Sequence, residues 1–268
     1  MTITVNDHLR DAQTLSNQLT NLYDDVDFTV VSTSQDDQKM KLERVCESAT
    51  DYLNNLIKNG DIIGLGRGQS ILQVAKGLLP KTVRDVEVVQ LDGIFTDPVD
   101  HFMGLEALSQ FSQAYNAMVQ LLPLPIMFAD PKNKALAEQE NHVRYVEKLG
   151  RVSNIAIFSI EDVSQSHFLN NDNYFTATEQ QQVQDQAVGE VLSHFIDGNG
   201  NPVVSEIEQR TVSIPLENLR YKEHSMVIVN KTTQVTALAT VLRSGYANEV
   251  FIDQQSAQLL LEMNHATT

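Results

Sequence analysis

A glycine-rich segment, Gly64 to Ser70, stands between two apolar stretches of different period. Asp61-Ile62-Ile63 is typical of a buried strand, and Ile71 to Leu79 has the spacing of an amphipathic helix. A strand, a glycine turn and a helix in this order direct unpaired backbone N–H groups and the positive end of the helix dipole at an anion. A tight turn that holds no ligand is the alternative. The candidate binding residues, for a phosphate or for sugar hydroxyls, are Gly66, Arg67, Gly68, Gln69 and Ser70.

A second predicted strand, Val86 to Leu91, ends at Asp92 and Gly93. In a doubly wound sheet, ligands bind at the carboxyl ends of the strands, so we expect these two residues to lie beside the glycine turn. The same pattern partly resembles a dinucleotide fingerprint, with Asp92 as the ribose-binding acid. A dinucleotide is disfavoured because the third glycine comes one residue early and Gln69 stands where the fingerprint has glycine.

Other reactive residue types show no catalytic or metal-binding pattern. The seven histidines lack metal-ligand spacing, so we predict neither a metal site nor a cofactor. His101 and His167 are kept as ligand-contact candidates because both lie in predicted loops at strand ends. The single cysteine, Cys46, lies on a helical pattern as a small core residue. The sequence has no Gly-x-Ser-x-Gly elbow and no Walker lysine, so hydrolase and nucleotidase functions lack support.

Strand-like and helix-like segments alternate along the chain. This alternation predicts an α/β fold, a three-layer, doubly wound, mostly parallel sheet with helices on both faces. The predicted strands are 28–31, 61–65, 86–91, 126–128, 155–158, 211–214, 226–229 and 250–252, and the predicted helices are 7–23, 45–56, 70–79, 105–118, 132–149, 179–186, 215–219, 233–242 and 256–263.

The remaining segments are predicted to be loops and turns. Residues 93–103 and 163–177 are expected to be loops, and the second is long enough to suggest a functional role. The turn cluster at 197–201 predicts a β-hairpin, placed as a small flap near 195–214. We expect one domain over residues 1–264, with 265–268 as a tail.

Composition limits the classes of partner. The formal net charge of −16 over 268 residues opposes direct contact with nucleic acid and with anionic membranes. One cysteine allows no internal disulfide, which suits a reducing compartment. No stretch is apolar enough to span a membrane and no signal-peptide pattern follows Met1, so we expect a cytoplasmic protein.

The order and spacing of several motifs resemble the sugar-binding, or effector, domain of the SorC family of bacterial transcription regulators. Each motif alone is weak, but together they cover nearly the whole chain. They are Gly64–Ser70, Val88–Gly93, Leu122–Pro125 with Asp130-Pro131, Asn154–Ile157, Ala187–Leu192 with Phe195 and Asp197–Gly200, Ala237-Leu238, Leu242–Gly245 and Val250–Asp253.

This resemblance implies a fold like that of ribose-5-phosphate isomerase and glucosamine-6-phosphate deaminase. It implies a sugar or sugar-phosphate effector and self-association into dimers or tetramers. The phosphate would rest on Gly68, Gln69 and Ser70, while Asp92 and Glu190 would accept hydrogen bonds from sugar hydroxyls. We therefore expect a sensor that controls a carbohydrate-utilisation operon and not an enzyme. The alternative is a sugar-phosphate isomerase or deaminase with Asp92 or Glu190 as its base.

The chain departs from the family pattern at three places. Arg67 replaces the usual Trp or Gly, and Ser159-Ile160-Glu161 replaces a glycine-rich turn. Gln234 stands where the family has a lysine, and Lys231 lies one turn earlier. A dianionic phosphate would be less well neutralised in such a pocket, so a neutral sugar or polyol remains open. The family's helix-turn-helix domain has no counterpart here, so DNA would be bound only through that missing segment.

Overall fold

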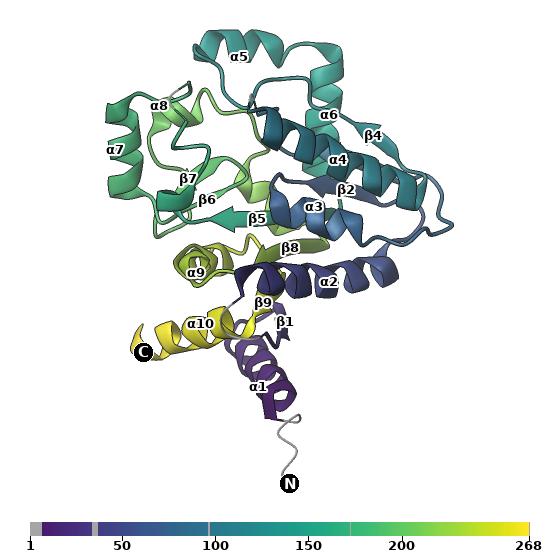
Figure 1. Ribbon diagram of the computed structural model, residues 1–268. Coiled ribbons are helices and arrows are strands. Elements are labelled where there is room, and N and C mark those ends of the chain that lie inside the picture. Colours follow the sequence, from purple (N-terminus) through teal and green to yellow (C-terminus); the bar gives the residue numbers. More distant parts are fainter. Residues whose placement is uncertain (1–6, 34–36, 96, 172, 268) are drawn as a thin grey trace.

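The computed structural model describes residues 7–33, 37–95, 97–171 and 173–267. At its centre, parallel strands run in the spatial order β1-β9-β8-β5-β2-β3-β4 (Figure 1). A short antiparallel pair, β6 and β7, extends the sheet beyond the carboxyl end of β5. The strands are β1 (Asp27–Val31), β2 (Ile62–Leu65), β3 (Glu87–Gln90), β4 (Met118–Gln120), β5 (Ile155–Glu161), β6 (Gly189–Val191), β7 (His194–Ile196), β8 (His224–Val229) and β9 (Glu249–Asp253).

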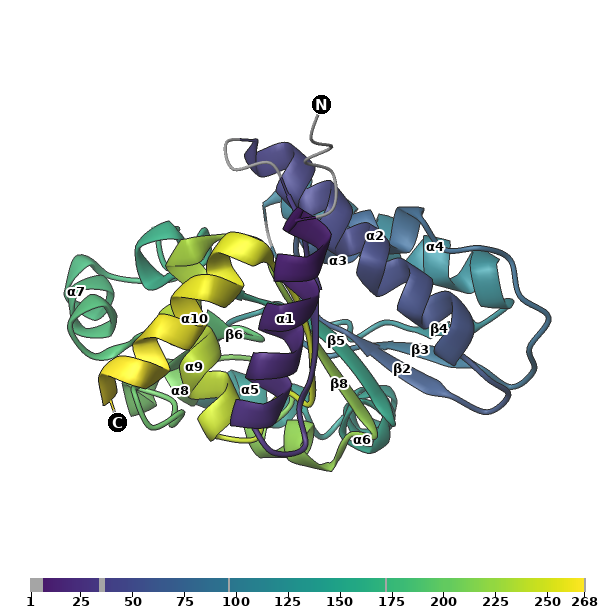
Figure 2. The same cartoon turned by 90° about the horizontal axis from the view of Figure 1, so that it is seen from below.

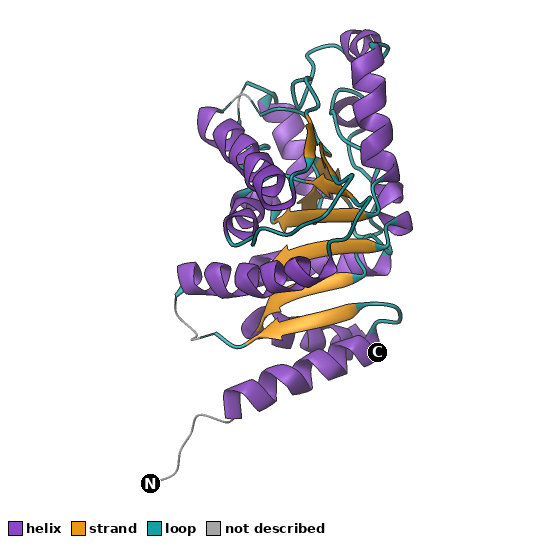
Figure 3. Ribbon diagram, turned by 90° about the vertical axis from the view of Figure 1, so that its right-hand side faces the viewer, coloured by secondary structure: helices purple, strands orange, loops and turns teal. Residues whose placement is uncertain are grey.

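Helices cover both faces of the sheet (Figures 2 and 3). On one face α2, α3 and α4 pack against strand residues such as Ile63 and Val88, and on the other α1, α6, α9 and α10 pack against residues such as Val89 and Ala156. This alternation explains why the strands are apolar throughout. The helices are α1 (Asp7–Leu22), α2 (Gln38–Leu56), α3 (Gln69–Lys76), α4 (Pro98–Tyr115), α5 (Pro131–Ala137), α6 (Asn141–Val152), α7 (Ala177–Gln186), α8 (Ser205–Glu208), α9 (Val235–Arg243) and α10 (Gln254–Thr267), with 3₁₀ turns at Val163–Gln165, Leu216–Tyr221 and Thr232–Gln234.

A separate apolar cluster lies beyond the carboxyl end of the sheet. It joins the 163–175 segment and α7 to the β6–β7 hairpin, and its centre is Phe168, stacked on Phe195 at 5.7 Å between ring centroids. This small lobe has its own core, so it can hold side chains rigidly above the strand ends. The polar segment after β5 is therefore organised by buried aromatic rings.

The structure corrects several predicted elements. Residues 126–128 form no strand and make only isolated bridges, while the edge strand is β4, which was not predicted and whose first residue, Met118, was the last of the predicted helix 105–118. The predicted loop 93–103 contains the start of α4 at Pro98, and the predicted helix 132–149 divides into α5 and α6. Short edge elements have too few residues to establish a period, so they are the ones that periodicity misplaces.

The hairpin also lies elsewhere than predicted. Its strands are β6 and β7, joined by Leu192 and Ser193, so it spans 189–196 and not 195–214. The 197–201 cluster does form a tight turn, closed by the Asp197 N–H donating to the Asn201 carbonyl. Thr211, however, bridges Met127 and not β7. At the other end, α10 continues to Thr267 and takes in most of the predicted tail.

Gly93 is required by a close approach of two chain segments. A Cβ at this position would lie 2.6 Å from the Ile126 Cα and 2.7 Å from the Ile126 nitrogen. The Gly93 N–H donates to the Val212 carbonyl, so the crossing point is fixed from a third segment as well. The role of Gly93 is to let the chain pass beneath residue 126 immediately after Asp92.

We expect Gly93→Ala to lower the free energy of unfolding by about 1–3 kcal/mol, because backbone has to move to admit the methyl group. Gly104→Ala is the matched control, since a Cβ at Gly104 meets nothing within 4 Å and the residue lies inside α4. There the substitution should stabilise by about 0.5–1 kcal/mol. Urea unfolding of both variants measures the difference, and equal effects would contradict the close-approach explanation.

Candidate functional site

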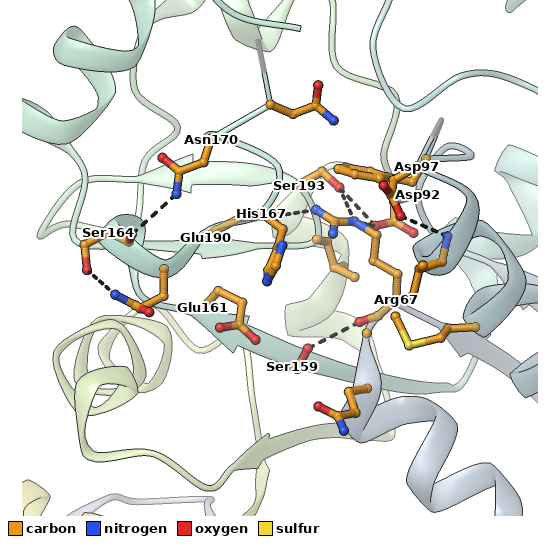
Figure 4. Close-up of a pocket in the computed structure, with 18 of the residues that line it drawn as sticks. Arg67, Asp92, Asp97, Ser159, Glu161, Ser164, His167, Asn170, Glu190 and Ser193 are labelled. Carbon is orange, nitrogen blue, oxygen red and sulfur yellow. Dashed lines mark hydrogen bonds and ion pairs between the residues drawn. The ribbon is translucent and has the colours of Figure 1, made fainter. Parts of the chain in front are cut away.

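A cavity of about 1230 Å³ opens above the carboxyl ends of β2, β3 and β5. Its floor comes from the β2–α3 turn and from Asp92, and its walls come from the start of α4, the 164–173 segment and the β6–β7 hairpin. Figure 4 shows the labelled side chains converging on it from these elements. The cavity therefore lies between the main sheet and the small lobe, at the edge that the sequence predicted.

Arg67 occupies the centre of this site. Its Nε lies 3.2 Å from the Asp92 Oδ2, and its Nη2 donates to the Glu190 carboxylate. The guanidinium carbon is 4.9 Å from the centroid of the Phe95 ring and 5.4 Å from that of Phe168. One cation thus holds two carboxylates, supplied by residues more than 90 positions apart, against an aromatic wall. The side chain points inward and not into bulk water.

Two serine hydroxyls complete the arrangement. The Ser193 hydroxyl donates to Asp92 Oδ2 at 3.0 Å and accepts a long hydrogen bond, 3.4 Å, from the Arg67 Nε. The fully buried Ser166 donates to the other oxygen of Glu190 and accepts from the Leu169 N–H. Glu190 is therefore oriented from both sides by side chains of the sheet and of the small lobe.

Asp92 retains one oxygen with no partner. Among the described residues, no hydrogen-bond donor reaches its Oδ1, which is buried. Burial raises the pKa of Asp92, Glu190 adds to the rise, and Arg67 and Ser193 oppose it. Leaving a buried acceptor unsatisfied costs about 1–3 kcal/mol. The site therefore contains a buried acceptor that is not used.

The hairpin turn that supplies Ser193 is strained. Leu192 and Ser193 have φ of 46° and 67°, which places both in the left-handed region that a two-residue hairpin turn requires. Glycine or asparagine is usual there, and a bulky side chain costs about 1–3 kcal/mol. Leu192 also lies over Gly66, where a Cβ would be 2.8 Å from its Cδ2. Gly66 is thus a packing glycine, and its N–H donates to the Ile157 carbonyl.

Two of the predicted cradle residues, Gly68 and Gln69, do line the cavity. Gly68 begins α3 with φ of 118° and no side-chain cap, so the first N–H groups of the helix are left for an external acceptor. Ser70 is buried outside the lining, and its carbonyl faces the Cys46 thiol at 3.5 Å. The cradle is therefore shorter than the sequence predicted.

Gln234 is not in the cavity lining. It is 1% exposed, its amide nitrogen donates to the Ile160 carbonyl at 2.5 Å, and its amide oxygen accepts from the N–H groups of Asn230 and Lys231, both at 3.0 Å. Both ends of the amide are used in joining the end of β5 to the segment after β8. Gln234 was a candidate ligand-binding residue, as was Gly93, which lies under Ile126; both lie outside the cavity lining, and their contact with a ligand stays a prediction.

A second ion pair stands at the more open side of the cavity. The Lys231 Nζ lies 3.5 Å from a Glu161 oxygen, and both side chains are more than a third exposed. Burial raises the pKa of Glu161, while Lys231 opposes the rise. Lys231 thus lines the cavity, with a carboxylate beside it.

Several lining residues were not identified from the sequence. Phe95, Asp97, Ser193 and the asparagines of the 163–177 loop belong to the lining, although the length of that loop had indicated a functional role. His167 lines the cavity, whereas His101 lies in the first turn of α4 outside the lining. A hairpin residue such as Ser193 carries no local motif, so only the fold reveals its position.

The hairpin carries a buried charge pair next to the site. His194 is 3% exposed, with its Nδ1 2.9 Å from a Glu208 oxygen and its Nε2 3.0 Å from the Ile214 carbonyl. Burial by itself would lower the pKa of His194, but Glu208 and the Ile214 carbonyl outweigh it, and the pKa is raised above 6.5. The pKa of Glu208 is lowered below 4.5, because His194 outweighs its burial.

Within the described residues, no group of three or more His, Cys, Asp or Glu side chains is placed to hold a metal ion. Within the same residues, no helix combines the length and the hydropathy needed to cross a bilayer.

A protein-family profile described as "Putative sugar-binding domain" matches residues 7–262. The chain is 31% identical, over 259 residues, to the "Deoxyribonucleoside regulator" of Bacillus subtilis (strain 168). That alignment covers 97% of this chain and 83% of the Bacillus protein. The profile match extends over nearly all of the described sheet and both helix layers.

Solved structures show the same fold. The chain is similar to "a domain of a possible sugar-binding transcriptional regulator" from Arthrobacter aurescens TC1, with a TM-score of 0.85 and 25% identity over 93% of this chain and 97% of that one. It also superposes on the full-length sorbitol operon regulator SorC of Klebsiella pneumoniae, with a TM-score of 0.84 and 19% identity over 97% and 84% of the two chains. These relatives are transcriptional regulators, not enzymes.

Arg67→Met should destabilise the domain by about 3–5 kcal/mol near neutral pH, because two buried carboxylates lose their common cation. The raised pKa of Asp92 means that acid protonates it before an ordinary aspartate, so the loss should shrink from pH 8 to pH 5. Arg44→Met, which removes the same charge from an exposed position on α2, is the control. Urea unfolding at both pH values measures the loss, and a pH-independent loss would show that packing alone explains it.

The His194–Glu208 pair should make stability depend on pH in a defined window. Since the folded pKa of His194 lies above 6.5, its contribution is complete below 6.5 and is lost as pH rises through the raised value. Since the folded pKa of Glu208 lies below 4.5, its contribution is lost only in stronger acid. Unfolding free energies of the wild type minus those of His194→Gln should therefore fall above pH 6.5. A difference that stays level up to pH 9 would mean that His194 is not charged in the fold.

Proposed function

Because the chain belongs to the SorC/DeoR family of sugar-binding domains of bacterial transcriptional regulators, we propose that the cavity around Arg67 is its effector site. The chain is the effector-binding domain of such a sugar-responsive regulator. The ligand proposed for the site is a sugar or a sugar phosphate. Binding would alter the equilibrium between regulator states and so control a carbohydrate-utilisation operon.

The observation that carries this proposal is the pair of buried carboxylates, Asp92 and Glu190, on the wall of a large cavity. Carboxylate oxygens are strong acceptors, and sugar hydroxyls are donors that also need acceptors of their own. The unpartnered Oδ1 of Asp92 is such an acceptor. That oxygen is sealed from solvent in this state, so a ligand reaches it only if a neighbouring group shifts.

The proposed contacts combine predicted and newly found residues. Gly68 and Gln69 would offer N–H groups at the start of α3, and Arg67 would orient the two carboxylates and bind hydroxyl oxygens. On the opposite wall stand the amide side chains of Asn170, Asn171 and Asn173. Gly66, Ser70, Gly93 and Gln234 serve the scaffold in this proposal.

The wider regulator is part of the same proposal. We propose that the domain self-associates into a dimer or tetramer, as the resemblance implies, and acts in the cytoplasm. DNA would be contacted by a part of the regulator outside these residues, since the net charge of −16 opposes direct contact here. The domain bounds proposed are 1–264, and the finer fold assignment is a doubly wound three-layer sheet similar to ribose-5-phosphate isomerase and glucosamine-6-phosphate deaminase.

A panel of sugars, sugar alcohols and their phosphates, screened by thermal shift, tests the proposal. A ligand held by the native state has to raise the melting temperature in proportion to the logarithm of its concentration above Kd. For a responding ligand, Asp92→Asn and Glu190→Gln should each weaken binding about tenfold or more by calorimetry, because a charged acceptor is lost.

Glu262→Gln removes one exposed carboxylate on α10 and should leave the Kd unchanged. Circular dichroism of each variant shows whether it is folded at the assay temperature. If the folded Asp92 and Glu190 variants bind the ligand with the wild-type Kd, the ligand does not bind in this cavity.

A further inference from the structure

We infer that the effector is an uncharged sugar or polyol, and that the cavity discriminates against the phosphate ester of the same compound. This inference rests on the proposed function, because it concerns the ligand of that same cavity. It is based on the negative charge of the cavity wall and on the ion pairs that the basic side chains of the wall already form.

The wall carries more acid than base. Among the described residues that line the cavity, the carboxylates are Asp92, Asp97, Glu161 and Glu190, whereas the permanently basic side chains are Arg67 and Lys231. When all four carboxylates are ionised the wall is negative by two, and a dianion placed there adds like charge to it. In a partly desolvated cavity such repulsion is far stronger than in water. The net charge of −16 on the whole chain acts in the same direction at longer range.

Both basic side chains already have acidic partners. Arg67 is committed to the buried carboxylates of Asp92 and Glu190, and Lys231 lies 3.5 Å from Glu161. A phosphate could recruit either cation only by competing with a covalently fixed carboxylate. At Arg67 that exchange would leave two buried acids without a counter-ion, which is a large cost. The two cations of this site therefore neutralise carboxylates of the cavity wall and are not available to a phosphate group.

The other donors suit hydroxyl groups. The start of α3 presents N–H groups with a partial positive charge of only about half a unit, which does not offset a surplus of two negative charges. Gln234, whose amide oxygen accepts from the Lys231 N–H, is neutral, and both ends of its amide already form hydrogen bonds. A hydroxyl can donate to Asp92 or Glu190 while accepting from an N–H, whereas an ionised phosphate can only accept.

Matched pairs of compounds test the inference directly. Sorbitol, erythritol, ribose and 2-deoxyribose are each compared with their terminal monophosphate, first by thermal shift and then by calorimetry on responding pairs, with inorganic phosphate alone as a control. In each responding pair we expect the unphosphorylated member to bind at least about tenfold more tightly, which corresponds to about 1.4 kcal/mol. Raising NaCl from about 50 to about 500 mM should leave its Kd nearly constant and should tighten binding of the phosphate ester, since salt screens repulsion.

A charge variant gives an independent readout. Glu161→Gln removes one wall carboxylate and frees Lys231, so the affinity ratio should move about three- to tenfold toward the phosphate ester at low salt. Glu262→Gln makes the same change in net charge far from the cavity and should leave the ratio unchanged.

The outcomes separate the two claims. A phosphate ester that binds as tightly as its parent compound, or more tightly, overturns this inference and leaves the proposed effector site standing. An unchanged ratio in a folded Glu161→Gln variant also overturns it. If no carbohydrate of either kind binds, the proposed function itself is wrong and the inference falls with it.

Discussion

The site depends on one arginine that is placed between two buried carboxylates. Arg67 leaves the sheet at the end of β2, Asp92 at the end of β3, and Glu190 comes from a hairpin that the chain builds more than 120 residues later. Without the guanidinium, neither acid could remain charged in its position, and the hairpin would lose the ion pair that joins Glu190 to the end of β2. The same interaction therefore shapes the cavity and fastens the small lobe to the domain.

Arg67 also contacts the aromatic core of this lobe. Its guanidinium packs against Phe95 and Phe168, and Phe168 stacks on Phe195 of β7. Polar and apolar contacts thus converge on the same few side chains. The left-handed turn at Leu192 and Ser193 is tolerated because Ser193 bonds Asp92 and Leu192 covers Gly66. The strain of the turn is offset by contacts that exist only when the lobe is seated on the sheet.

Much of the main sheet could be predicted from the sequence, because long apolar strands and amphipathic helices have clear periods. The position of the site also followed from topology, because the carboxyl ends of parallel strands lie at the same edge of the sheet. Arg67 follows β2 and Asp92 follows β3, so the two residues were expected to be neighbours. The direction of the Arg67 side chain could not be predicted. The sequence is compatible with a side chain that points into water, whereas in the structure it points into the site. The turn-forming cluster at 197–201 does close an antiparallel bridge between Ile196 and Pro202, but the hairpin turn at Leu192-Ser193 has no glycine or asparagine and so gave no signal in the sequence.

Gln234 has a consequence for how binding specificity can evolve in this lineage. Its amide must donate at one end and accept at the other, in a space that excludes water. A lysine there could still donate to the Ile160 carbonyl, but it would leave the N–H groups of Asn230 and Lys231 without their acceptor and would bury a charge, so it would weaken the joint between β5 and the segment after β8. The proposed ligand preference is therefore easier to change at the partly exposed Glu161 than at the buried Gln234.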